Sequence, residues 1–335
     1  MPSRNSSSFS SCQIMGIPFF YDKCKNVNFD FPKIFLTVVF VAVFIFGLLG
    51  NCWGLKSILR NWKKLGNIRI FALNLCIADI LYLLTLPFLV TYQAQKQNWI
   101  FGQPFCKITR FLFNVNLYGS IGFLTCISVY RYLGIVHTLR GRGRIKVHHS
   151  IGISALVWTV VLLQCLPDVF FDKTVKNRTK CYDSTTDNST EAYLRYSITQ
   201  TVIGFAIPLV IIVCCYGHMA VSLATKKGIG DAKLKLKCLR LVVILAVLFS
   251  ICFIPIHIFR NLNLMTRISK INNVCKPWFS SIYIAKQISD GLACLNSAIN
   301  PLVYLLNSDQ LLKQCLKFKR KGRQTEKRSQ VTYAM

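Results

Sequence analysis

Acidic residues are scarce in this sequence, which has 12 Asp and Glu against 41 Lys and Arg in 335 residues. Charged residues make up only 16% of the chain, whereas 53% are hydrophobic and the mean hydropathy is +0.43. Soluble domains of this length are rarely so apolar. The sequence also lacks a glycine-rich phosphate loop, His and Cys residues at metal-ligand spacing, and the spacing of a serine or cysteine triad. These absences argue against an enzyme and against a soluble domain.

Apolar runs that are long enough to span a bilayer, about 20 residues each, recur along most of the chain. The predicted spans are Ile34–Leu59, Ile70–Gln93, Cys106–His137, Ile151–Phe171, Tyr193–Ala224, Leu236–Leu264 and Ser280–Leu306. The predicted fold is therefore an all-α membrane protein, a seven-transmembrane helix bundle over residues 34–306. Residues 1–33 form an N-terminal segment without a signal-peptide pattern, so we expect the first span to act as the insertion signal.

The net charge of +29 is distributed unevenly. Basic residues gather after the first, third and fifth spans, at 60–69, 140–146 and 226–237, and in the tail at 313–328. The positive-inside rule places these segments in the cytoplasm and the N-terminus outside the cell, and this distribution argues against a nucleic-acid partner. The glycosylation sequons at Asn5, Asn177 and Asn188 all lie on the predicted outer side, where glycosylation occurs. We therefore expect a multi-pass protein of the plasma membrane.

The tail, residues 307–335, begins with apolar residues placed among cations: Leu311, Leu312, Cys315, Leu316 and Phe318. This pattern predicts a short amphipathic eighth helix that lies on the membrane surface. Cys315 is then either a palmitoylation site or a plain buried thiol.

Polar groups in the middle of two spans predict a functional interior. Asn296, Asn300 and Pro301 lie in the seventh span, and Asp79 lies in the second. Such groups are costly in hydrocarbon and persist mainly where they face the bundle interior. Asp79 needs polar partners, and the candidates are Ser120, Asn296 and Asn300.

Each of the third to seventh predicted spans contains a short characteristic motif or a single characteristic residue. They are Tyr130-Arg131-Tyr132, Trp158, Pro208, Phe253-Ile-Pro255 and Asn300-Pro301-Leu-Val-Tyr304. Taken together they resemble the family-A (rhodopsin-like) G-protein-coupled receptors. The resemblance implies that Arg131 and Tyr132 couple to a heterotrimeric G protein, that arrestin binds, and that Pro255, Pro301 and Tyr304 take part in activation. It also implies a sodium ion among Asp79, Ser120, Asn296 and Asn300. The alternative is a hydrogen-bonded Asp79 without an ion.

The chain departs from this family at the residues that restrain Arg131. Tyr130 stands where the family has Asp or Glu, and Lys235 is the residue of the sixth span that faces the same position. Neither is an acid, so we expect basal signalling, unless hydrogen bonds from other residues replace the missing restraints.

Four of the 15 cysteines lie near span ends on the predicted outer side, which is oxidising: Cys24, Cys106, Cys181 and Cys275. Their connectivity does not follow from the sequence alone. The family resemblance implies Cys106–Cys181 and Cys24–Cys275, which leaves Cys12 over.

Three cations lie near the outer ends of their spans, namely Arg110, Arg260 and Lys286. Basic groups in a low-dielectric bundle need an anionic partner, and arginine suits phosphate and carboxylate. His257 lies one turn deeper than Arg260. Asn114 and Tyr118 follow Arg110 at i+4 and i+8 and so share its face. The alternative for the cations is that they reach toward the lipid headgroups.

A closer resemblance covers Cys24 to Asp309. The segments Asn98–Gly102, Cys106–Ser128, Cys181-Tyr182-Asp183 and His257-Ile-Phe-Arg260 are similar to those of the purinergic nucleotide receptors, nearest to their ADP- and UDP-sensing, Gq-coupled branch. This resemblance implies a small anionic ligand, most simply a nucleotide, and coupling to Gq, with Gi second. The ligand set it implies is Arg110, Asn114, Tyr118, Tyr182, His257, Arg260, Lys286 and Asp290.

Asp290 is itself a departure, because these receptors usually have Arg at its position. Either Lys286, one turn outward, replaces that cation and a nucleotide still binds, or Asp290 pairs with Lys286 or Arg260. The second arrangement favours a less charged ligand, such as the carboxylates of the related succinate and oxoglutarate receptors, or a lipid.

A multi-span transporter is the rival class of protein, but the chain shows no internal repeat of the kind that transporters have.

Overall fold

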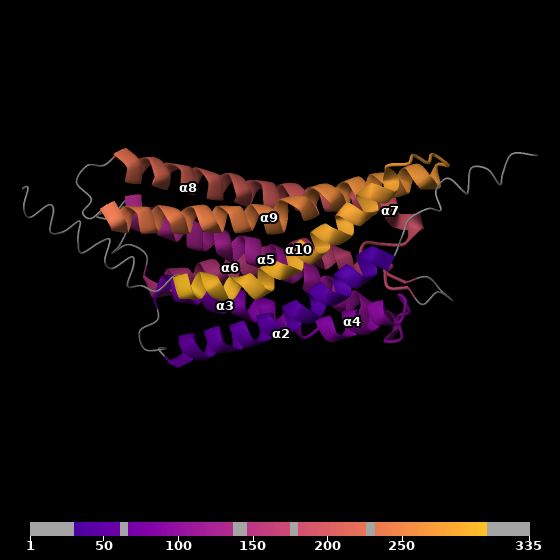
Figure 1. The fold of residues 1–335 in the computed structure, drawn as a ribbon, viewed down its shortest axis with the longest axis horizontal. Coiled ribbons are helices and arrows are strands. Elements are labelled where there is room, and N and C mark those ends of the chain that lie inside the picture. The colour runs from indigo at the N-terminus through magenta and orange to yellow at the C-terminus, as the bar shows by residue number, and fades with distance from the viewer. Residues whose placement is uncertain (1–29, 61–65, 137–145, 175–179, 226–231, 307–335) are drawn as a thin grey trace, which may run out of the picture.

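The computed structural model describes residues 30–60, 66–136, 146–174, 180–225 and 232–306. Its long helices are α2 (Asp30–Arg60), α3 (Asn67–Leu83), α4 (Leu86–Ala94), α5 (Gly102–Val136), α6 (Val147–Cys165), α7 (Thr190–Thr201), α8 (Ile207–Thr225), α9 (Ala232–Ile271) and α10 (Phe279–Leu306). They run side by side along the long axis of the molecule (Figure 1). No strand occurs in the described residues.

These helices make up the seven predicted spans. The second consists of α3 and α4, and the fifth consists of α7, the π-helical turn η4 (Val202–Ala206) and α8. Among the described segments, six are long and apolar enough to cross a bilayer. The seventh, α10, contains Lys286, Asp290 and several amides, yet it packs against α2 and α9 inside the bundle. The predicted eighth helix and Cys315 lie outside the described residues.

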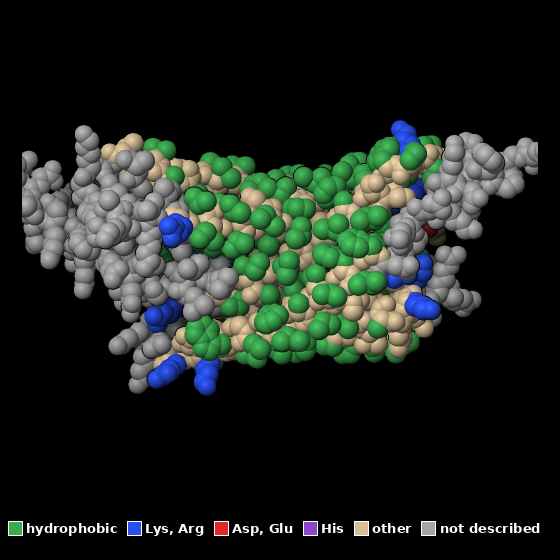
Figure 2. Space-filling model, viewed as in Figure 1, with side chains coloured by type: hydrophobic (Ala, Val, Ile, Leu, Met, Phe, Trp, Pro, Cys, Tyr) green, Lys and Arg blue, Asp and Glu red, His purple; other side chains and the backbone are tan. Residues whose placement is uncertain are grey.

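The bundle has apolar side chains on its outer surface and polar ones inside. Phe46, Leu49 and Leu163 are each about two-thirds exposed, whereas Asn51 and Asp79 are fully buried. On the face shown in Figure 2, hydrophobic side chains cover the middle and Lys and Arg lie near the two ends. This distribution suits a hydrocarbon solvent around the middle of the bundle, where internal polar groups must find partners in the protein.

Prolines account for the irregular turns. Pro208 has no N–H to donate to the carbonyl of Gly204, and the chain widens there into η4. Pro87 lies in the first turn of α4, directly after the break at Leu84 and Thr85, and the Thr85 hydroxyl caps the carbonyl of Tyr82 at 2.7 Å. The break lies inside the predicted span at 70–93, and the segment from Asn67 to Ala94 is still long and apolar enough to cross a bilayer as one unit.

The helices extend slightly beyond the predicted spans. The largest difference is in α9, which continues to Ile271 instead of ending near Leu264, and this extension adds two full turns at the end where the predicted ligand residues lie. Pro255 lies inside α9 and Pro301 inside α10.

The bundle has two ends, which are named here by residues that lie near them. The end near Cys106 is the disulfide end, and the opposite end is the Arg131 end.

Candidate functional site

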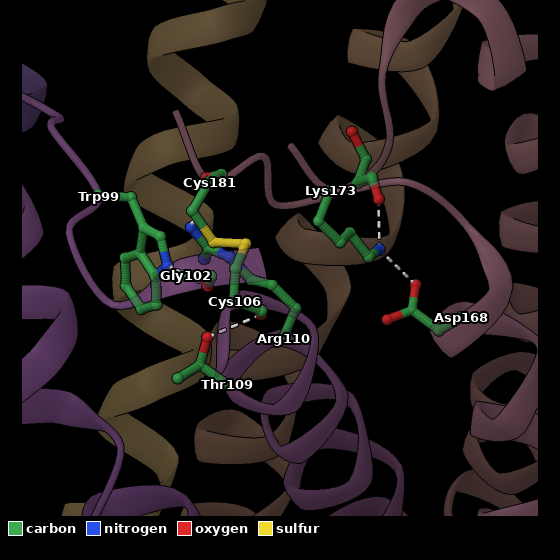
Figure 3. The surroundings of a disulfide bond; sticks show 9 residues. Trp99, Gly102, Cys106, Thr109, Arg110, Asp168, Lys173 and Cys181 are labelled. Atoms are coloured by element: carbon green, nitrogen blue, oxygen red, sulfur yellow. Dashed lines mark hydrogen bonds and ion pairs between the residues drawn. A yellow bond between two sulfur atoms is a disulfide. The ribbon is translucent and has the colours of Figure 1, made fainter. Parts of the chain in front are cut away.

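A disulfide bond fixes the segment after α6 across one end of the bundle. Cys106, in α5, is bonded to Cys181, with 5.8 Å between their Cα atoms, and this confirms the predicted pair. Arg110, one turn further along α5, donates to the carbonyl of Cys181 at 3.1 Å. The Trp99 indole donates to the carbonyl of Gly102 at 2.7 Å and braces the start of α5 (Figure 3). The loop is therefore held over the interior of the bundle.

Other predicted features of this end are only partly described. Cys275 is disulfide-bonded, but its predicted partner, Cys24, lies outside the described residues. Asn188 is exposed in the short helix η3 (Asp187–Ser189), as a glycosylation acceptor requires. The other two sequons, at Asn5 and Asn177, lie outside the described residues.

Beneath the loop lies a cavity of about 330 Å³, within the size range of small-molecule sites. Its walls come from α2, α3, α4, α5, α9, α10 and the loop. Six basic side chains line it: Arg110, Lys180, Arg260, Arg267, Lys270 and Lys286. Three acidic side chains line it: Asp183, Asp187 and Asp290. The cavity therefore carries a surplus of positive charge and suits an anion.

Arg260 is the most deeply buried arginine of the cavity, with 6% of its surface exposed. Its Nη2 donates to the Asn114 side-chain oxygen at 3.0 Å and to the Tyr193 hydroxyl at 2.9 Å. Its Nη1 is buried and has no hydrogen-bond partner among the described residues. The wall of the cavity thus contains a fixed guanidinium with a donor still available.

Arg267 lines the cavity and joins α9 to the loop. It forms an ion pair with Asp187 at 2.8 Å and donates to the Ser184 hydroxyl, also at 2.8 Å. Its guanidinium carbon lies 5.8 Å from the centre of the Tyr182 ring. These contacts tie the loop to α9, so Tyr182 lines the cavity beside a cation as well as beside the disulfide.

Lys286 is buried in the α10 wall between two carboxylates. Asp290 accepts from its ammonium at 2.7 Å, and Asp183 of the loop also forms an ion pair with it. Of the two arrangements that the sequence left open, the structure has the one in which Asp290 pairs with Lys286. The positive charge of this wall is therefore compensated, and the remaining positive charge of the cavity lies on the α5 and α9 sides and on Lys180 of the loop.

Three of the predicted ligand residues do not line this cavity. Asn114 lies behind Arg260 and orients it. The Tyr118 hydroxyl donates to Gln200 at 3.3 Å, and the His257 ring stacks on Phe205 with 4.3 Å between ring centres. The helical spacing identified their face correctly but not their depth. Conversely, Arg267 and Lys270 were missed, because the sixth span was predicted to end before them.

A second polar cluster surrounds Asp79 in the middle of the bundle. Asn300 donates to both carboxylate oxygens, at 3.2 and 2.9 Å, and Asn116 donates to one of them at 2.8 Å. The Ser297 hydroxyl donates to Asn116 at 3.1 Å. Asn116 and Ser297 were not predicted, although their polarity within apolar spans was a usable signal.

The other two predicted members of this cluster have buried atoms without partners. The Ser120 hydroxyl and the Asn296 side-chain nitrogen are both buried, and neither has a hydrogen-bond partner among the described residues. Asp79 itself, although fully buried, is bonded to neutral amides. Ser120 lies one turn after Asn116 on α5, and Asn296 lies one turn before Asn300 on α10, so both unused polar groups share a helix face with a partner of Asp79.

At the Arg131 end, Arg131 is buried. Its predecessor Tyr130 accepts a hydrogen bond from Asn67 at 3.1 Å, and the hydroxyl of Tyr132 lies 3.0 Å from His218 Nδ1. The backbone of Tyr304 belongs to α10, but its side chain and that of Lys235 lie outside the described residues.

Comparison with known proteins gives consistent matches. Residues 50–304 match the family model of the 7 transmembrane receptor (rhodopsin family). The chain is 38% identical to P2Y purinoceptor 1 of Homo sapiens over 303 residues, which are 90% of this chain and 81% of that protein. It is 37% identical to P2Y purinoceptor 1 of Gallus gallus over 90% of this chain and 83% of that protein. It is also 37% identical to P2Y purinoceptor 3 of Gallus gallus over 82% of this chain and 85% of that protein.

Proposed function

The chain belongs to the rhodopsin family of seven-transmembrane receptors, among the purinoceptors, and from this premise we propose that it binds an extracellular nucleotide resembling ADP or UDP. It is a multi-pass membrane receptor, not an enzyme. The nucleotide would bind in the cavity at the disulfide end, and binding would activate a heterotrimeric G protein at the Arg131 end. The proposed orientation places the disulfide end outside the cell and the C-terminal tail in the cytoplasm.

The observation that carries this proposal is the excess of positive charge around the cavity. Arg260 has a buried Nη1 and Arg110 a buried Nε, and neither atom has a hydrogen-bond partner among the described residues. Buried cationic donors are costly unless an anion accepts from them. Arginine binds phosphate through paired hydrogen bonds, which favours a phosphate-bearing ligand.

The test is calcium release in cells that express the full-length receptor. The panel is ADP, ATP, UDP, UTP, succinate and 2-oxoglutarate. We expect a response to at least one nucleoside diphosphate, and its loss in Arg260→Ala. Arg195→Ala is the matched control, because Arg195 is exposed on α7 and does not line the cavity. Silence to every nucleotide at normal surface expression would refute the proposed ligand.

The proposed G protein is Gq, and Gi is the alternative. A ligand-evoked rise in calcium that depends on phospholipase C supports Gq, whereas a fall in cyclic AMP without that dependence supports Gi. Arrestin recruitment is expected for either. In both cases Arg131 is the proposed contact with the G protein, together with Tyr132.

A second candidate ligand is a carboxylate metabolite such as succinate or 2-oxoglutarate. The observation that favours it is the neutralised α10 wall, where Asp290 and Asp183 both pair with Lys286. This arrangement leaves fewer cations for a polyphosphate. A response to the dicarboxylates alone, abolished by Arg260→Ala, would select this candidate over the nucleotide.

The Asp79 cluster fits a sodium ion, because a buried carboxylate bonded to neutral amides lies with a buried hydroxyl that lacks a partner. The residues that would hold the ion are Asp79 and Ser120, with the neighbouring Asn116, Asn296, Ser297 and Asn300. The ion would supply the counter-charge for Asp79, and oxygen ligands suit such a hard cation. We expect sodium to raise the thermal stability of the purified receptor and Asp79→Asn to abolish that effect.

A further inference from the structure

A buried ion pair lies behind the cavity, outside the proposed ligand contacts. Lys173, in the loop, donates to Asp168 at 2.7 Å, and both side chains are fully buried (Figure 3). The ammonium also donates to the carbonyl of Ser184 and lies 4.7 Å from the centre of the Tyr193 ring. Burial lowers the pKa of Lys173 to about 8, and the neighbouring Asp168 opposes this decrease. The lysine therefore remains largely protonated at neutral pH.

One hydroxyl connects this pair to the cavity. Tyr193 is fully buried, donates to Asp168 at 3.0 Å and accepts from Arg260 at 2.9 Å. The Arg260 nitrogen and the Asp168 oxygen are thus within about 6 Å of each other, close enough for strong interaction in a low-dielectric interior. The other Asp168 oxygen is buried without a hydrogen-bond partner among the described residues.

The charges of Asp168 and Lys173 have opposite effects on how strongly Arg260 attracts an anion. Asp168 orients the guanidinium through Tyr193, but its charge also attracts Arg260 and competes with any anion in the cavity. Lys173 compensates Asp168 at closer range. When Asp168 and Lys173 are both charged, the group of Arg260, Asp168 and Lys173 keeps one net positive charge. The Arg260 Nη1, which has no hydrogen-bond partner among the described residues, can then donate to an anion in the cavity.

Resting on the proposed function, we propose that Lys173 and Asp168 are positioning residues that set the strength of the anion site through Arg260. Asp168 and Tyr193 fix where the guanidinium lies, and Lys173 prevents Asp168 from neutralising it. The pair thereby determines how strongly the cavity discriminates between ligands of different charge, without touching the ligand.

Two substitutions separate this role from a purely structural one. Lys173→Met leaves Asp168 uncompensated, and ADP potency should fall at least about tenfold, because a charge within about 6 Å of Arg260 is no longer balanced. Asp168→Asn retains an acceptor for Tyr193 and removes the charge that competes with the anion, so ADP potency should be at least as high as that of wild type. A salt bridge that served only folding would make both variants similarly poor.

The double variant Asp168→Asn/Lys173→Met keeps the experiment decisive if Lys173→Met alone folds badly. It removes both charges and should restore surface expression and most of the ADP potency. Tyr193→Phe should lower ADP potency by deleting the bridge, whereas Tyr196→Phe should not. Tyr196 is its neighbour on α7, and its hydroxyl donates to the carbonyl of Gln164 instead.

The measurement is ADP- and AMP-evoked calcium release from full-length receptors matched for surface expression. Lys173→Met should lower the potency of ADP more than that of AMP, because ADP carries more charge, whereas a folding defect would lower both by the same factor. If wild type responds and Lys173→Met is no weaker than Asp168→Asn, or if ADP and AMP shift equally, this inference is wrong. A wild type that no anion of the panel activates refutes the proposed function, and this inference with it.

Discussion

Replacing Asp290 with Asn tests whether this carboxylate competes with an anionic ligand for Lys286. Asp290 lies 2.7 Å from the buried Lys286 and occupies the ammonium that an anion would otherwise use. The substitution removes one of the three negative charges around the cavity and retains the size of the side chain. Asp183 still pairs with Lys286, so the lysine is not left alone. We therefore expect the receptor to become more sensitive to nucleotides.

The size of the gain follows from the geometry. A phosphate that accepts from Lys286 would lie about 5 Å from the Asp290 carboxylate, because each charged contact is about 2.8 Å long. Two unit charges at about 5 Å repel by roughly 3 kcal/mol at an effective dielectric constant of about 20. The Asp183 side chain is 31% exposed, so water screens this region and reduces the repulsion. A net gain of about 1.4 kcal/mol, or tenfold in potency, is expected.

The assay is the concentration at which ADP evokes half-maximal calcium release, compared at equal surface expression. Asp172→Asn is the control, because Asp172 is an acid at the same end that is 64% exposed, pairs with Lys107 at 3.8 Å and does not line the cavity. Its effect should not exceed about threefold, as for most exposed ion pairs. A loss of ADP potency in Asp290→Asn would mean that the carboxylate is needed to hold Lys286, and that the competition described here is wrong.

Three further outcomes are expected. Replacing Cys106 and Cys181 by Ser opens a link across 75 residues and should cost about 2–4 kcal/mol of stability, seen as a lower midpoint of thermal inactivation; an unchanged midpoint would contradict this. Gly204→Ala would place a methyl group against the Gln164 amide and 2.5 Å from the Tyr118 ring, and it should cost about 1–3 kcal/mol, measured in the same assay; no cost would mean that both side chains can move aside. Arg131→Ala should lower basal signalling below wild type without ligand, and equal signals would show that no basal activity exists.

Hydropathy was sufficient to predict most of this fold. Each long apolar run became a helix or a pair of helices, because a backbone in hydrocarbon must satisfy its own hydrogen bonds. The break between α3 and α4 was not predicted, although Pro87 signalled it. The end of α9 was placed too early, because its last two turns are rich in polar residues such as Thr266, Arg267 and Lys270, and hydropathy alone does not distinguish these from a loop.

The cavity was harder to predict than the fold. Arg110, Arg260 and Lys286 were found because cations near the ends of apolar spans are conspicuous. The position of Lys286 between Asp183 and Asp290 was not predictable in full, because Asp183 belongs to a loop more than 100 positions away in the sequence. Helical periodicity places a side chain on a face, but the depth of that side chain depends on which neighbouring helices pack there.

The loop between α6 and α7 also has a mechanical consequence. It is bound to α5 by the disulfide, to α9 through Arg267 and to α10 through Lys286. α9 is therefore anchored about 18 Å beyond Pro255, while its other arm extends about 35 Å to Ala232, at 1.5 Å per residue. Because the short arm is held, a bend of about 10° at Pro255 would displace the end of the long arm by roughly 6 Å. Under the proposed role of Pro255 in activation, a small change of angle beside the cavity would therefore become a large displacement at the Arg131 end.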